Sequence, residues 1–198
     1  MNDVTGPRVF LSASVPLPSR NPAYFETANV IAIRDAVRAL TIVVSEKHIT
    51  LVFGGHPAIS PMIRLQIAQT GNRVRDRVVM FQSRFFERQF PDDNASFEKV
   101  ELVDAVQNDR EKSLLYMREV MLAKPFDAGV FIGGMEGVEQ EFDMFRQLQP
   151  DIPAFPIAST GAAAAILFDR NSELQHKHPE LRDEISYLTL MRDLIAPN

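Results

Sequence analysis

The sequence predicts a doubly wound α/β fold, in which a mainly parallel, Rossmann-like sheet carries helices on both faces. Short β-branched apolar runs alternate along the chain with longer segments whose apolar residues recur at helical spacing. The short runs are apolar throughout, as expected for strands that are buried on both faces. No linker or low-complexity tract interrupts this alternation, so the 198 residues are expected to form one domain over 1–198.

The predicted strands are six apolar runs, each bounded by turn residues. They lie at residues 8–12, 49–53, 78–82, 99–103, 127–132 and 152–159. Because a helical segment separates most of them from the next run, consecutive strands are expected to run parallel through right-handed crossovers.

Helices are predicted where apolar residues recur every three or four positions or where capping residues mark the ends. The first is expected over residues 24–47. The second has Ser60 as its N-cap and Pro61 at its first helical position, and Gly71 ends it. The third is capped by Asp109 and runs to about residue 123. Further helices are expected at 137–148, 161–168 and 179–194.

The segment 83–99 is aromatic and charged but has no clear period, so it is expected to be a loop or an irregular helix that forms a lid or rim. Two interpretations of its phenylalanines stay open. They could stack on a base, or they could pack in the core or in a dimer interface. The residues concerned are Phe81, Phe85, Phe86 and Phe90.

The composition excludes several classes of function. A net charge of −5 argues against general nucleic-acid binding, which needs a basic face to replace phosphate counterions. The absence of cysteine excludes disulfides, thiolate nucleophiles and cysteine-based zinc sites. No histidine has a partner at metal-binding spacing, so we predict no metal site and no cofactor. No apolar run reaches the roughly 18 residues that a membrane span needs, so we predict a cytoplasmic protein without membrane contact.

Four turns that follow predicted strands are rich in glycine or in small hydroxyl residues. They are Ser12-Ala13-Ser14, Gly54-Gly55-His56-Pro57, GGMEG at 133–137, and Ser159-Thr160-Gly161. In an open parallel sheet, ligands bind beyond the carboxyl ends of the strands. Exposed amides and helix N-termini at such turns bind anions, so we predict a crevice for a nucleotide or a phosphorylated nucleoside. The simpler alternative is that these glycines only make tight turns. Neither a P-loop nor G-x-G-x-x-G is present, which argues against ATPase and ordinary dinucleotide-binding functions.

The run GGMEGVEQE, from Gly133 to Glu141, resembles a motif of the SLOG superfamily. This Rossmannoid group includes the Lonely guy phosphoribohydrolases and nucleotide-sensor domains of bacterial defence systems. The hydrolases carry R-K-x-x-M, then a strand, then P-G-G-x-G-T-x-x-E. Glu141 falls on the final glutamate of that motif and Arg118 on its arginine. The segments VFLSASVP and VFGGHPAISPMIRLQIA are similar to the family's earlier turns, so the resemblance covers about residues 8–168.

Four departures from the hydrolase pattern favour the sensor-type members. Gly133 replaces the proline, Met135 a glycine, Val138 the threonine, and Glu119 the lysine. The missing threonine removes a hydroxyl that would help to bind phosphate, and Glu119 reverses a charge.

The resemblance therefore implies that the chain binds or senses a nucleotide or an NAD-derived molecule of the ADP-ribose type, in a bacterial defence or stress system. The amides of the glycine turns would hold phosphate, chiefly at Gly54, Gly55, Gly134 and Gly137, and Glu141 would hold the ribose. The predicted ligand-binding residues are Ser12, Ala13, Ser14, Gly54, Gly55, His56, Arg118, Gly133, Gly134, Met135, Glu136, Gly137, Val138, Glu141, Thr160 and Gly161.

Two other functions stay open. The chain could be a phosphoribohydrolase that cleaves the N-glycosidic bond of a nucleoside 5′-monophosphate, with Arg118 and Glu141 as catalytic residues. It could also be a protein-interaction module whose crevice is empty. In that case Glu141 only complements a helix dipole and Arg118 is an ordinary surface arginine.

The expected partners are a small nucleotide ligand and a second copy of the chain. We predict a homodimer through the long first helix and the apolar C-terminal helix. Any effector would be a separate protein, and no nucleic-acid partner is expected.

Overall fold

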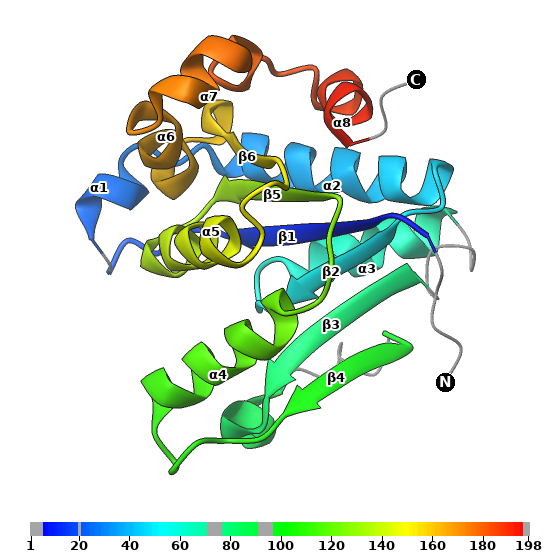
Figure 1. Cartoon of the computed structure of the whole chain (residues 1–198), viewed down its shortest axis with the longest axis vertical. Coiled ribbons are helices and arrows are strands. Elements are labelled where there is room, and N and C mark those ends of the chain that lie inside the picture. Colours follow the sequence, from blue (N-terminus) through cyan, green and yellow to red (C-terminus); the bar gives the residue numbers. More distant parts are fainter. Residues whose placement is uncertain (1–5, 20, 71–76, 91–96, 196–198) are drawn as a thin grey trace.

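The computed structural model describes residues 6–19, 21–70, 77–90 and 97–195. Its centre is a six-stranded sheet in the order β4-β3-β2-β1-β5-β6, in which every neighbouring pair is parallel (Figure 1). The predicted α/β fold with a parallel sheet is confirmed. The strands are β1 (Arg8–Ser14), β2 (Thr50–Gly54), β3 (Val78–Ser83), β4 (Lys99–Val103), β5 (Ala128–Gly133) and β6 (Ala154–Ile157).

Helices cover both faces of the sheet, as the uniformly apolar strands require. The α-helices are α1 (Pro22–Phe25), α2 (Val30–Glu46), α3 (Ser60–Thr70), α4 (Arg110–Leu122), α5 (Glu136–Leu148), α6 (Ala162–Asp169), α7 (Ser172–Lys177) and α8 (Tyr187–Ile195). The 3₁₀ segments are η2 (Arg84–Gln89), η4 (Ala158–Thr160) and η5 (Pro179–Leu181).

The side chains of each strand alternate between two cores. Val9 and Leu11 of β1 pack with α2, α3 and α8 on one face, whereas Phe10 packs with α4 and α5 on the other. The second core is aromatic: the rings of Phe10 and Phe145 stack with centroids 5.7 Å apart, and Phe131 packs edge-on against both. The rigid packing of α4 and α5 on this face fixes the side chains that they present to the carboxyl ends of the strands.

Two of the predicted helices are wrong in extent because polar side chains interrupt them. The helix expected over 24–47 is split into α1 and α2, since the carboxamide oxygen of Asn29 accepts a hydrogen bond from the amide of Ala32 and so starts a new helix. The helix expected over 179–194 is split into η5 and α8. Between them, the carboxylate of Glu184 accepts from the amide of Ser186.

Smaller corrections concern the elements near residues 60 and 160. Ser60 is the first residue of α3, and its hydroxyl points to the sulfur of Met80, so it does not cap the helix. Gly71, the predicted helix end, lies outside the described residues. The last strand, expected over 152–159, is limited to β6, because residues from Ala158 turn into η4.

Helix α8 packs its apolar face on α2 within the chain. Tyr187, Leu190 and Met191 are buried there, and Arg192 makes a bidentate ion pair with Glu46 at the end of α2. This packing already covers the apolar face assigned above to a dimer contact. A dimer would therefore need another surface of these helices, and the homodimer stays a prediction. In the described ranges, no helix combines the length and apolar character that crossing a bilayer requires.

Candidate functional site

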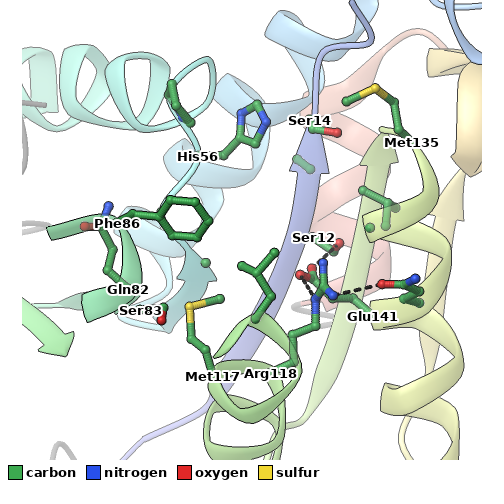
Figure 2. Close-up of a pocket in the computed structure, with 18 of the residues that line it drawn as sticks. Ser12, Ser14, His56, Gln82, Ser83, Phe86, Met117, Arg118, Met135 and Glu141 are labelled. Carbon is green, nitrogen blue, oxygen red and sulfur yellow. Dashed lines mark hydrogen bonds and ion pairs between the residues drawn. The ribbon is translucent and has the colours of Figure 1, made fainter. Parts of the chain in front are cut away.

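The carboxyl ends of β1, β2 and β3, the turn before α5, and helices α4 and η2 surround a cavity of about 550 Å³ (Figure 2). The sheet order places this cavity beside β1, where the chain order reverses between β2 and β5. In open parallel sheets this is the place where ligands bind. The volume is in the range of small-molecule sites.

Three elements meet at the carboxylate of Glu141. The hydroxyl of Ser12, on β1, donates to Glu141 Oε2 at 2.6 Å, and Arg118 Nε, on α4, donates to Glu141 Oε1 at 3.0 Å (Figure 2). Arg118 Nη1 also donates to the carboxamide oxygen of Gln140 at 2.9 Å. The side chains of Arg118 and Glu141 are only 12% and 14% exposed. The carboxylate is therefore fixed in position, and its charge is balanced inside the cavity wall.

Gly137 leaves the space that the Arg118 guanidinium occupies. A Cβ atom built on Gly137 would lie 3.0 Å from Arg118 Nη2, which is tighter than ordinary van der Waals contact. Nε and Nη1 of Arg118 donate to Glu141 and Gln140. The third nitrogen, Nη2, lies beside Gly137 at the start of α5.

Two of the four predicted phosphate-binding amides are used by the fold itself. The amide of Gly55 donates to the carbonyl of Phe81, and that of Gly134 donates to the carbonyl of Ser14, both at 2.9 Å. The hypothesis that these two amides hold phosphate is therefore wrong. At the start of α5, the amides of Glu136 and Gly137 have no acceptor within the described part of the chain. These helix-terminal donors are what remains for an anion.

Twelve of the sixteen predicted ligand-binding residues line the cavity. The other four, Gly133, Gly134, Thr160 and Gly161, do not line it, and ligand binding by these residues stays a prediction. Thr160 is fully buried; its hydroxyl accepts from the amide of Gly133 at 2.8 Å and donates to the carbonyl of Ile157 at 2.6 Å. Gly161 lies against the backbone of Thr27, far too close for a Cβ atom. These residues connect β5 and β6 and hold the turn before α5 in place. The twelve lining residues are Ser12, Ala13, Ser14, Gly54, Gly55, His56, Arg118, Met135, Glu136, Gly137, Val138 and Glu141.

The wall away from Glu141 carries aromatic and apolar side chains beside polar ones, and sequence reasoning found only part of it. Figure 2 shows Phe86, Gln82 and Ser83 on this side, together with Met117 of α4. The ring of Phe86 packs edge-on against Phe85, with centroids 5.0 Å apart. Gln82 and Ser83 were missed as site residues, although two polar residues at the end of an apolar strand are the pattern that marks Ser12 and Ser14. The other lining residues that were missed are Leu11, Pro57, Ser60, Gln89, Arg110, Glu111, Leu114 and Gln140.

His56 presents a neutral imidazole to the cavity. Its Nδ1 accepts a hydrogen bond from the amide of Ala58 at 3.2 Å, which places the proton on Nε2. Burial lowers the pKa of His56 below its ordinary value of 6.5. The side chain can therefore donate a hydrogen bond to a ligand but adds no positive charge. No cluster of metal-ligating side chains is found among the residues that the structure describes.

Comparisons with known proteins agree with this architecture. The X-ray structure of TM1055, a target of the Northeast Structural Genomics Consortium, matches with a TM-score of 0.56 over 83% of this chain and 81% of that chain. The two chains are 14% identical, so the likeness shows a shared fold alone. No curated protein matches the chain. The model of the SLOG cluster3 family, however, matches residues 23–195, which include the Arg118–Glu141 pair and the cavity lining apart from its β1 residues. The chain therefore belongs to the SLOG cluster 3 family and, with it, to the SLOG superfamily.

Proposed function

We propose that the protein binds a small nucleotide-derived molecule in this cavity and acts as a sensor for it. The observation that carries the proposal is the division of the cavity into two unlike walls. A charged wall holds the fixed Arg118–Glu141 pair, and an aromatic and apolar wall contains Phe86 and Met117. A nucleoside has the same division between its polar sugar and its flat base.

The charged wall suits a ribose and one phosphate group. The Glu141 carboxylate accepts one hydrogen bond on each oxygen and retains lone pairs for sugar hydroxyls. Arg118 Nη2 and the amide of Gly137 are neighbouring donors that could share a phosphate oxygen.

The apolar wall suits the base. Phe86 and Met117 offer a ring face and a polarizable thioether, and Leu114 adds aliphatic surface. The neutral His56 and the carboxamide of Gln82 lie on the same side and supply hydrogen-bonding groups for a base edge.

Hydrolysis of an N-glycosidic bond is the second candidate, and the juxtaposition of Arg118 and Glu141 favours it. In that reaction water adds to the anomeric carbon and the base leaves with a proton. A carboxylate beside the sugar would stabilise the positive charge that develops on the ring. Both Glu141 oxygens already accept internal hydrogen bonds, which favours a holding role for this residue over a reacting one.

A thermal-shift screen with AMP, ADP-ribose, cyclic ADP-ribose and NAD tests the proposal, with chromatography of each sample for released base. A ligand at 100 times its dissociation constant should stabilise the fold by about 2.7 kcal/mol. Glu141→Gln should abolish the shift, whereas Glu173→Gln, which changes an exposed carboxylate on α7, should not. Stabilisation without base release supports the sensor. Base release that is lost in Glu141→Gln supports the hydrolase, and no shift with any compound contradicts nucleotide binding.

A further inference from the structure

The cavity is lined by more anionic than cationic side chains. Two of them are cationic and three are anionic, because Arg110, Arg118, Glu111, Glu136 and Glu141 all line it. Arg118 pairs with Glu141, and Arg110 pairs with Glu111. Within the described residues Glu136 has no cationic partner. Since His56 is neutral, the cavity carries an excess of negative charge, and that excess is located on Glu136.

Glu136 stands where an anionic ligand group would have to bind. It is the first residue of α5, its side chain is exposed, and its own amide and that of Gly137 are the amides left without an acceptor at this helix start. Its negative charge is felt nearby, because it adds to burial and to Glu139 in raising the pKa of the Tyr24 phenol. A phosphate held by Gly137 and Arg118 would therefore have a carboxylate beside it.

From this placement, and resting on the nucleotide-binding function proposed above, we infer that Glu136 is a specificity residue that selects against phosphate monoesters. A monoester carries close to two negative charges near neutral pH, whereas a diester carries one. Like charges that lie close together repel, more strongly where water is partly excluded, and the second charge of a monoester adds to this repulsion. Arg118 already balances Glu141, so its Nη2 hydrogen bonds and the partial positive charge of the helix end offset at most a single phosphate charge. The preferred ligand class is a nucleoside whose phosphate is a diester.

The test compares, by titration calorimetry at low salt and about pH 7.5, the 5′-monophosphate and the 3′,5′-cyclic monophosphate of adenosine, guanosine, cytidine and uridine. The wild-type protein should bind the cyclic diester of its preferred base about tenfold more tightly than the monoester, which corresponds to about 1.4 kcal/mol. Glu136→Gln should recover about tenfold in affinity for the monoester and change the affinity for the diester less than threefold. Glu119→Gln, which removes an exposed carboxylate of α4 outside the cavity, is the matched control.

The outcomes separate this inference from the proposed function. If the monoester binds more tightly than the diester and Glu136→Gln leaves the ratio unchanged, Glu136 is not a specificity residue, while nucleotide binding stands. If none of the compounds binds, nucleotide binding itself is contradicted, and the role of Glu136 falls with it. A second readout is the affinity for the monoester at about pH 5.5, below its second pKa of about 6. Partial protonation should strengthen binding to the wild-type protein more than to Glu136→Gln.

Discussion

Arg118 and Glu141 form an ion pair at 3.0 Å in the wall of the cavity, although 23 residues separate them along the chain. Each lies on a helix that packs on the aromatic face of the sheet, and Ser12 ties the carboxylate to the central strand. The pair thus has two roles. It joins α4, α5 and β1, and it gives a ligand a carboxylate whose position does not have to be reorganised on binding.

Removal of Arg118 should cost more stability than removal of an exposed arginine. Arg118→Ala leaves the largely buried Glu141 carboxylate with Ser12 as its remaining donor among the described residues, so the free energy of unfolding should fall by about 1–3 kcal/mol. Arg192→Ala breaks an ion pair that is more than two-fifths exposed, so its effect on the free energy of unfolding should be clearly smaller. Urea denaturation measures both. Equal losses would mean that the Arg118–Glu141 pair has no special energetic role.

Gly137→Ala should separate stability from ligand binding. Alanine in a helix is favoured over glycine by about 0.5–1 kcal/mol, and among the described residues the new methyl group comes close only to the flexible end of Arg118. The fold should therefore be as stable as before or slightly more stable. The displaced guanidinium should lose its contact with the ligand, which lowers affinity about tenfold or more.

Gln147→Ala, an exposed position on the same helix, is the control for Gly137→Ala. It should leave both unfolding and ligand affinity unchanged. A Gly137→Ala protein that binds as well as the wild type would show that Arg118 Nη2 does not contact the ligand.

The strand pattern and the glycine turns were sufficient to predict the sheet and most of one side of the cavity. Local signals of this kind identify a strand end, and the parallel topology then places all such ends at one edge. Thr160 and Gly161 also follow a strand, but they do not line the cavity. Their strand, β6, lies two positions from β1, and the hydroxyl of Thr160 is consumed by the amide of Gly133. Strand order, which a single sequence does not specify, decides between the two cases.

The apolar wall was harder to predict because it comes from helix faces. Met117 and Leu114 are part of a helical pattern that is equally consistent with packing in the core. Met117 packs in the core and also lines the cavity. The sequence also overestimates how many glycine amides are available to a ligand. A glycine amide near a predicted site is free only if no other strand or turn accepts its hydrogen bond, and Gly55 and Gly134 both have such an acceptor.

His56 should make stability sensitive to acid. Burial lowers its pKa in the folded state below 6.5, so the unfolded chain takes up the proton first as the pH falls. The free energy of unfolding should therefore decrease as the pH drops below 6.5 and should be unaffected by this residue at higher pH.

The variant His56→Asn isolates this contribution to the pH dependence. Its carboxamide oxygen can still accept from the amide of Ala58, but it does not titrate, so the decrease in stability below pH 6.5 should become smaller. Urea denaturation at a series of pH values gives the comparison, with His176→Asn on the exposed part of α7 as the matched control. An unchanged profile in His56→Asn would exclude the buried imidazole as the acid-sensitive group.

Phe86→Ala should weaken the binding of nucleotides by removing the aromatic surface of the apolar wall. Stacking between a base and an aromatic ring contributes about 1–3 kcal/mol in alanine substitutions of proteins that bind single-stranded nucleic acid, so the affinity should fall between about fivefold and more than a hundredfold. Ribose 5-phosphate has no base, and its affinity should change much less. Phe86 is only partly buried and its edge-on contact is with Phe85, so the fold should tolerate the change. Phe25→Ala, on the exposed side of α1 and outside the cavity, is the matched control. If the two substitutions have the same effect on nucleotide affinity, the base does not lie against Phe86, and the apolar wall must be assigned to packing.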